Sequence, residues 1–148
     1  KQKTAYEISA CLVGSEMCIR DRDKAYDKLT ETLGKNWQKE YIVWDMCCGV
    51  GNLEVKHSNP RNIFMSTLDA ADVDVMKATK TCVAAQRFQY DYLNDDITDD
   101  GQIDYSLSNK VPASLRKAIA EGKKILVLIN PPRLVLTSIT PFFILSML

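Results

Sequence analysis

The 148-residue chain lacks an excess of charge of either sign, because 19 lysines and arginines balance 19 aspartates and glutamates. A general positive field that would draw the whole chain toward nucleic acid is therefore excluded. Any DNA-binding surface must be local or lie in sequence outside this chain. The apolar fraction of 46% is large enough for the core of one domain, or of part of a larger one.

Metal-binding patterns are also lacking. The five cysteines include the adjacent pair Cys47 and Cys48, but none lies in a CxxC spacing, and His57 is the only histidine. These features disfavour a zinc site and the disulfide framework of a secreted domain. The acidic stretch Asp96–Leu107 departs from the calcium-loop pattern at its last position, where a leucine replaces the bidentate glutamate. We expect no metal and a reduced, cytoplasmic location.

Long apolar runs are scarce as well. The only long run without a charge is Leu134–Leu148, which is shorter than the ~20 residues that a membrane-spanning helix needs. The start of the chain lacks the basic region and apolar core of a signal peptide. We expect no membrane partner.

The sequence does contain a strand that runs into an acid and a glycine turn. Tyr41–Trp44 has the length and β-rich composition of a buried strand, and Asp45, Cys47 and the turn Gly49–Gly51 follow it. Open α/β sheets hold nucleotide-like ligands with this combination at the carboxyl edge of their strands. The glycines would let the backbone approach such a ligand, because a Cβ there would collide with it.

Two further expected strands also lead to acids. Ile63–Leu68 runs into Asp69, which lies 18 residues beyond the glycine turn, near the ~20-residue offset of a ribose-binding carboxylate. The alternative role for Asp69 is the N-cap of the next helix. Phe88–Leu93 is the candidate third strand, and it carries Asp91 and Tyr92 toward its carboxyl end.

The fourth expected strand, Ile125–Ile129, is the most β-like run of the chain and ends on Asn130-Pro131-Pro132. Helical patterns alternate with these strands, which predicts an α/β fold with a parallel sheet and helices on both faces. We expect His57 on the surface of the helix after the glycine turn. The expected helices are Asp23–Glu40, Asn52–His57 as the start of the next, Asp72–Arg87, and one between Pro112 and Gly122.

The glycine turn does not fit a dinucleotide site. The dinucleotide fingerprint needs a third glycine where this chain has Glu54, and Asp45 just before the turn would repel a phosphate. The missing glycine and the carboxylate of Asp45 together disfavour a dehydrogenase. Asp45 would instead suit the amino group of a cationic amino-acid moiety, such as that of S-adenosylmethionine.

Asn130–Pro132 directly after an apolar strand closely resembles the catalytic motif of adenine-N6-specific DNA methyltransferases. Asp45–Gly51, Asp69 and Asp91 precede it in the order and approximate spacing of that family's motifs. The resemblance spans roughly residues 41–132. It implies a truncated, Rossmann-like class I methyltransferase fold, S-adenosylmethionine as cofactor, and DNA as partner, in a bacterial restriction–modification system.

The resemblance also implies a role for each motif. The acid and the glycine turn would surround the methionine part of the cofactor, Asp69 would bind its ribose, and Asp91 would lie near its adenine. The residues expected to bind the cofactor are Asp45, Cys47, Gly49, Gly51, Asp69, Asp91 and Tyr92.

Asn130, Pro131 and Pro132 are the expected catalytic residues. The exocyclic nitrogen of adenine is a poor nucleophile, and two acceptors on its N–H groups would stabilise the positive charge that develops during methyl transfer. The Asn130 side chain and the carbonyl of Pro131 could supply these acceptors. The two prolines fix φ, so both acceptors would be positioned in advance.

The two ends of the chain fit the family less well. In the family an aromatic residue follows the second proline and stacks on the target base, whereas this chain has Arg133. We expect native sequence to end near Pro132, with 133–148 as a separate apolar tail. The alternatives are that Arg133 stacks on the base and that the tail is a buried fifth strand.

Tyr6–Arg22 resembles a peptide that recurs in metagenomic gene predictions, where sequencing-adapter DNA has been translated. We therefore expect residues 1–22 to be a non-native leader, with an ordinary amphipathic leader as the alternative, and residues 23–132 to be a partial catalytic domain. Such a fragment would bind its cofactor weakly and would not methylate DNA unaided.

Two other functions remain open. Methyltransferases that act on an RNA adenine or a protein glutamine share Asn-Pro-Pro, and only sequence outside this chain would separate them. The other alternative is a non-catalytic nucleotide-binding module, in which Arg133 marks a site without catalysis.

Overall fold

The computed structural model describes residues 16–129 and 143–147. The chain forms two compact units, which divide after Trp37. The expected catalytic residues Asn130, Pro131 and Pro132, together with Arg133, lie outside the described residues.

The first unit contains one long helix, and a short helix spans the boundary between the two units. Helix α2 spans Glu16–Leu33, and the short helix α3 spans Trp37–Glu40. Gly34 separates them with a φ of 90°, a left-handed conformation that glycine adopts without strain. The expectation of a single helix over Asp23–Glu40 was therefore wrong at its start and in its middle.

The second unit contains a five-stranded sheet in the order β3-β2-β1-β4-β5. Strands β1 to β4 are parallel to one another, whereas β5 pairs with β4 in the antiparallel direction. The α/β class expected from the sequence is confirmed, but β5 departs from the expected all-parallel sheet. The strands are β1 Ile42–Asp45, β2 Ile63–Thr67, β3 Gln86–Gln89, β4 Ile125–Ile129 and β5 Phe143–Met147.

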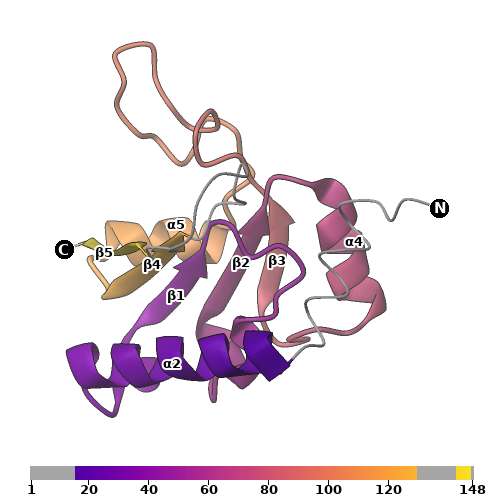
Figure 1. Cartoon of the computed structure of the whole chain (residues 1–148). Helices are drawn as coiled ribbons and strands as arrows, with labels where there is room; N and C mark the ends of the chain where they lie inside the picture. The colour runs from indigo at the N-terminus through magenta and orange to yellow at the C-terminus, as the bar shows by residue number, and fades with distance from the viewer. Residues whose placement is uncertain (1–15, 130–142, 148) are drawn as a thin grey trace, which may run out of the picture. The chain divides into compact units, whose positions relative to one another are not determined.

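Strand β3 begins and ends earlier than the expected Phe88–Leu93. The backbone N–H of Tyr90 still donates to Thr67 on β2, at 2.9 Å. Beyond it the chain turns, because Asp91 and Asp95 exchange two hydrogen bonds through the Asp91 N–H and the Asp95 N–H. Figure 1 shows the long loop between β3 and α5 projecting beyond the carboxyl ends of the strands.

Two helices cover opposite faces of the sheet: α4, which spans Ala70–Ala78, and α5, which spans Ala113–Ala120. Adjacent residues of a strand point to opposite faces. Gln86 donates to the Ser114 hydroxyl of α5 at 2.8 Å, whereas its neighbour Arg87 donates to the carbonyl of Met76 on α4 at 3.1 Å.

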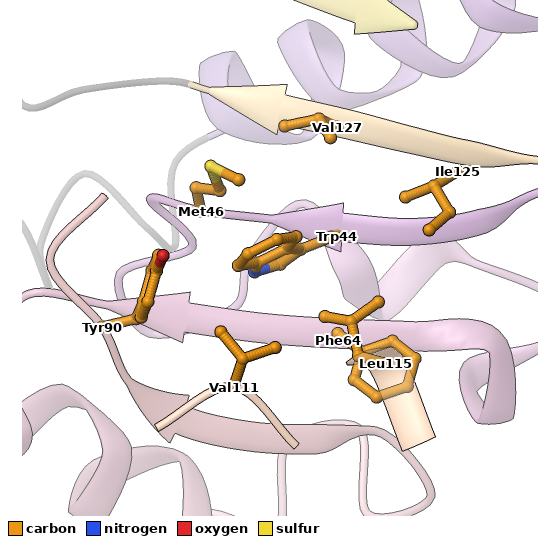
Figure 2. Close-up of a cluster of buried hydrophobic side chains, with 8 residues drawn as sticks. All are labelled: Trp44, Met46, Phe64, Tyr90, Val111, Leu115, Ile125 and Val127. Carbon is orange, nitrogen blue, oxygen red and sulfur yellow. The ribbon is translucent and has the colours of Figure 1, made fainter. Parts of the chain in front are cut away.

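The core on the α5 side is centred on Trp44, whose side chain is fully buried. Its ring lies 5.4 Å from that of Tyr90 and 5.5 Å from that of Tyr105, and its Nε1 donates to the Ser66 hydroxyl at 3.0 Å. Figure 2 shows how this cluster fills the space over β1, β2 and β4. Its members are Trp44, Met46, Phe64, Tyr90, Val111, Leu115, Ile125 and Val127.

The helices flanking β2 differ from expectation. The segment after the glycine turn forms only a 3-10 turn, η1, over Glu54–Lys56, so no α-helix follows the glycines. A second 3-10 turn, η2, spans Pro60–Asn62. Helix α4 begins before the expected Asp72 and ends well short of Arg87, because Lys80 and Cys82 adopt left-handed φ values of 56° and 48°.

The segment before β4 follows expectation. Pro112 is the residue just before α5, and Gly122 closes the turn after it with a φ of 68°. Among the described residues, no helix combines the length and the apolar character needed to cross a membrane.

Candidate functional site

Four parallel strands bring the expected site segments to one edge of the sheet. The order β3-β2-β1-β4 places Asp91, Asp69 and Asp45 in a row along this edge, each at or just beyond the end of its strand. Strand β4 lies next to β1 and ends at Ile129, immediately before Asn130. The strand order reverses between β1 and β4, and open α/β sheets bind their ligands at such a switch point.

The first strand and the fourth are closely tied at this edge. Asp45 is in register with Leu128, and the N–H of Met46 donates to the Leu128 carbonyl at 3.0 Å. The carboxyl ends of β1 and β4 therefore lie side by side, as a site shared by the two segments requires.

The glycine turn is a tight backbone turn between β1 and η1. The N–H of Cys48 donates to the Ser66 carbonyl of β2 at 2.9 Å, and the N–H of Gly51 donates to the Cys48 carbonyl at 2.9 Å. Gly49 and Gly51 have φ values of 54° and 82°, which a side chain would strain.

The two glycines meet different surroundings. A Cβ on Gly51 would lie 2.3 Å from Met65 Cε and 3.1 Å from Thr81 Cγ2, whereas a Cβ on Gly49 would meet nothing within 4 Å. Gly51 thus lets the turn pack onto the core beneath it. Only Gly49 presents an open backbone, so the expected close approach to a ligand concerns this glycine.

The side chain of Asp45 points into the interior of the protein. Its side chain is 2% exposed, and its Oδ1 accepts a hydrogen bond from the N–H of Cys47 at 2.8 Å. Glu54 of η1, also 2% exposed, interacts with it. Burial raises the pKa of Asp45, although hydrogen bonds from Glu54 and Cys47 oppose the rise. The expected contact of Asp45 with an amino group stays a prediction.

Asp69 is exposed and caps α4, since its Oδ1 accepts a hydrogen bond from the N–H of Ala71 at 2.8 Å. The capping role weighed as the alternative is therefore present, and the ribose contact stays a prediction. Asp72, in the first turn of α4, accepts a hydrogen bond from the Thr67 hydroxyl at 3.1 Å.

Asp91 holds the turn that follows β3. Its carboxylate accepts hydrogen bonds from the Asn94 side chain at 2.6 Å and from the N–H of Leu93 at 3.0 Å. The hydrogen bond from Asn94 is the main reason why the pKa of Asp91 lies below its usual value. Asp91 is thus ionised at neutral pH and fixed in place beside Tyr92.

A cavity of about 190 Å³ opens at this edge, on the α5 side of the sheet. Burial raises the pKa of its three tyrosines, so the phenols are uncharged at neutral pH. The surroundings are otherwise apolar, which suits a flat, neutral group. The lining residues are Met46, Tyr90, Tyr92, Ile97, Ile103, Tyr105, Val127 and Ile129.

Sequence reasoning found only Tyr92 among these tyrosines. The alternation of Phe88, Tyr90 and Tyr92 was a usable signal, because every second residue of a strand lies on one face. Tyr105 sits in a loop of no regular pattern, and only the folded chain shows that it reaches the cavity.

His57 is buried, contrary to the expected surface position. Its side chain is 7% exposed, and its Nδ1 accepts a hydrogen bond from the N–H of Asn59 at 3.0 Å. Burial lowers its pKa to about 4. The residue closes the 3-10 turn η1 rather than standing on a helix.

We expect His57 to stay neutral in the folded protein down to pH values near 4. The unfolded chain binds its proton near pH 6.5, so stability should be lost as the pH falls from about 6.5 toward 4. An NMR titration of the ring protons measures this pKa directly. His57→Asn keeps an acceptor near the Nδ1 position and should flatten that part of the stability profile. A ring that titrates near 6.5 would contradict the burial.

In the part of the chain that the structure describes, no group of three or more histidine, cysteine, aspartate or glutamate side chains could hold a metal ion. Comparisons with protein-family models, with curated proteins and with solved structures found no match for the chain. The function is therefore inferred from the geometry of the site.

Proposed function

We propose that residues 41–132 belong to the catalytic domain of a Rossmann-like class I methyltransferase that transfers a methyl group from S-adenosylmethionine to adenine N6 in DNA. The observation that carries this proposal is the order of the strands at the carboxyl edge. Asp91, Asp69 and Asp45 follow one another there, and the strand that leads into Asn130 comes next.

This order matches the order of the parts of the cofactor. S-adenosylmethionine runs from adenine through ribose to methionine, and the methyl group is carried on the sulfur of the methionine part. A cofactor laid along the edge from β3 to β1 would bring its adenine to Asp91 and Tyr92 and its ribose to Asp69. Its methyl group would then face the strand that leads into Asn130. A different strand order would separate these contacts.

The cavity beside Tyr92 supports the adenine end of this placement. Its volume of about 190 Å³ is below the range of pockets that enclose a whole drug-sized ligand, so it has room for one ring system rather than a complete cofactor. Its aromatic and apolar lining favours stacking of a flat ring, and the ionised Asp91 next to it can accept hydrogen bonds from an amino group.

The chemistry assigned to Asn130 needs no further ionisable group. S-adenosylmethionine would supply an electrophilic methyl group, whose bond to sulfur would break as the adenine nitrogen bonds to its carbon, and the nitrogen would then release a proton to water. The Asn130 side-chain oxygen and the Pro131 carbonyl would accept hydrogen bonds from the amino group and stabilise its growing positive charge.

Calorimetry with S-adenosylmethionine and with NAD tests the proposal. We expect binding of S-adenosylmethionine and none of NAD. Tyr92→Ala should weaken this binding by a factor of about 5 to 150, because an aromatic stacked on a base contributes about 1–3 kcal/mol. Tyr41→Ala is the matched control, since Tyr41 precedes β1 at the opposite edge of the sheet.

Tight NAD binding without S-adenosylmethionine binding would overturn the proposal. A second arm separates binding from transfer. Asn130→Ala should bind the cofactor like the wild type, and in a chain that contains the complete catalytic domain it should lose methyl transfer to DNA. Cofactor binding with transfer to RNA or to a protein amide, and none to DNA, would reassign the substrate.

A further inference from the structure

Two buried carboxyl groups flank the glycine turn. Asp45 ends β1 and Glu54 begins η1, so Gly49 and Gly51 lie in the segment that connects them. Each side chain is only 2% exposed. Apart from Asp45 and its own backbone N–H, the Glu54 carboxyl group meets no hydrogen-bond donor among the described residues, although both of its oxygens are buried.

Among the described residues, no positively charged side chain pairs with Asp45 or Glu54. The other titratable groups around the pair are the thiols of Cys47, Cys48 and Cys82 and the carboxylate of Asp72, all neutral or negative. Arg87, which acts on Cys82, directs its guanidinium to the carbonyls of Met76 and Thr81.

Two adjacent carboxylates without a cation cannot both be ionised in a buried site, because each charge loses its hydration and repels the other. Burial, and then the charge of Asp45, hold the pKa of Glu54 well above its usual range. A protonated Glu54 has an O–H that can donate to Asp45. That single proton joins Glu54 to Asp45, although both Glu54 oxygens are buried without a donor from any other described residue.

We propose that Glu54 keeps its proton at neutral pH and donates it to Asp45, and that this shared proton fastens the glycine turn to the end of β1. Asp45 is itself held in the sheet through β4, since it pairs with Leu128. Glu54 is then a positioning residue: loss of the proton leaves two buried carboxylates that repel each other and opens the turn. The inference concerns the turn itself and does not require the methyltransferase proposal.

The direction of the pH dependence follows from the proton. A carboxyl group that binds its proton more tightly in the folded than in the unfolded chain contributes stability below the unfolded pKa of about 4.5 and loses it as the pH rises. His57 has the opposite effect on stability, which it lowers as the pH falls, but only below about pH 6.5. The interval between pH 6.5 and 8 therefore excludes the effect of His57, and a comparison with a Glu54 variant removes the effects of groups that both proteins share.

The test compares Glu54→Gln with the wild type in urea unfolding across this interval. Glutamine keeps an N–H donor for Asp45 and has no proton to lose. We expect the unfolding constant of the wild type to rise relative to that of Glu54→Gln, by at most tenfold per pH unit for one linked proton. Glu121→Gln, which changes an exposed glutamate paired with Lys123, should follow the wild type. Parallel profiles for Glu54→Gln and the wild type would overturn the proposal.

Infrared spectroscopy can detect the protonated carboxyl group in the wild type itself. The folded wild type at pH 7 should show the C=O absorption of a protonated carboxylic acid, and Glu54→Gln should lack it. A wild type without this band at pH 7 would overturn the proposal, even if Glu54→Gln fails to fold. Amide exchange at Gly51 and Cys48 should accelerate with pH more steeply in the wild type than in Glu54→Gln, because the turn opens.

One further arm rests on the proposed function. If the turn holds S-adenosylmethionine, affinity for it should fall between pH 6.5 and 8 in the wild type and stay constant in Glu54→Gln. Absence of cofactor binding at every pH, with the infrared band and the stability difference retained, would refute the methyltransferase proposal and support the shared proton.

Discussion

Replacing Trp44 with alanine is expected to lower the free energy of unfolding by about 3–5 kcal/mol, the usual cost of removing a fully buried aromatic side chain. Trp44 is completely buried at the centre of the sheet and packs against Tyr90 and Tyr105. Its removal would leave a cavity on the α5 side and would take away the donor to the Ser66 hydroxyl. Urea unfolding followed by circular dichroism measures the change.

Two matched variants separate packing from hydrogen bonding at this site. Ser66→Ala removes the acceptor of the indole N–H and also the donor to the Asp45 carbonyl at 3.2 Å, and it should cost about 1–3 kcal/mol. Trp44→Phe keeps a ring in the cluster, so its loss of stability should lie between those of Trp44→Ala and Ser66→Ala. A Trp44→Ala protein that loses no more stability than Ser66→Ala would contradict the central place of this side chain in the core.

The second large effect is expected at Gly51. Gly51→Ala places a Cβ 2.3 Å from Met65 Cε at a φ of 82°, so a buried methionine must move and the backbone is strained as well. A left-handed non-glycine residue costs about 1–3 kcal/mol, and the steric conflict adds to this. We expect a loss of roughly 2–4 kcal/mol in urea unfolding.

Gly101→Ala is the control for backbone strain, because Gly101 has a φ of 79° and a Cβ there would meet nothing within 4 Å. The difference between the two variants then reports the contact with Met65 and Thr81. Equal losses at both positions would show that the glycine turn does not pack on the core. In a double-mutant cycle, Gly51→Ala should cost less in a Met65→Ala background than in the wild type, since Met65→Ala removes the conflicting atom.

The central strands were predictable because their sequences are apolar throughout. β1, β2 and β4 are covered on both faces, and strands of that kind appear as short continuous apolar runs. Ile125–Ile129 was located without error, β2 ends one residue before the expected Leu68, and β1 is shifted by one residue at both ends. β3 lies at the edge next to β2, contains polar residues and was placed too late in the chain.

The helices were less predictable, because what ends them is not a sequence signal. Lys80 and Cys82 take left-handed conformations without being glycine, so nothing in the sequence marks the end of α4. The segment after the glycine turn has helix-forming residues but makes only one 3-10 turn. Its side chain Glu54 is drawn into the protein beside Asp45, a tertiary interaction that outweighs local preference.

The candidate site was predictable in its segments and not in its contacts. The order of the acids along the chain pointed to one edge of the sheet, and the strand order places Asp45, Asp69 and Asp91 there. The sequence analysis treated Glu54 only as the absence of a glycine. Glu54 forms a buried pair with Asp45 because two segments nine residues apart pack against each other. The sequence pattern of neither segment predicts this packing.

The position of β4 beside β1 has a consequence for biosynthesis. A growing chain completes β1, β2 and β3 before it reaches Ile125, so one side of β1 must wait for a partner that is made much later. Until then the apolar residues of β1 border an unpaired edge, a form prone to association with other chains. The pairing of β1 with β4 is thus the last part of the parallel sheet to form, and a nascent chain that ends before Ile125 leaves this edge of β1 unpaired.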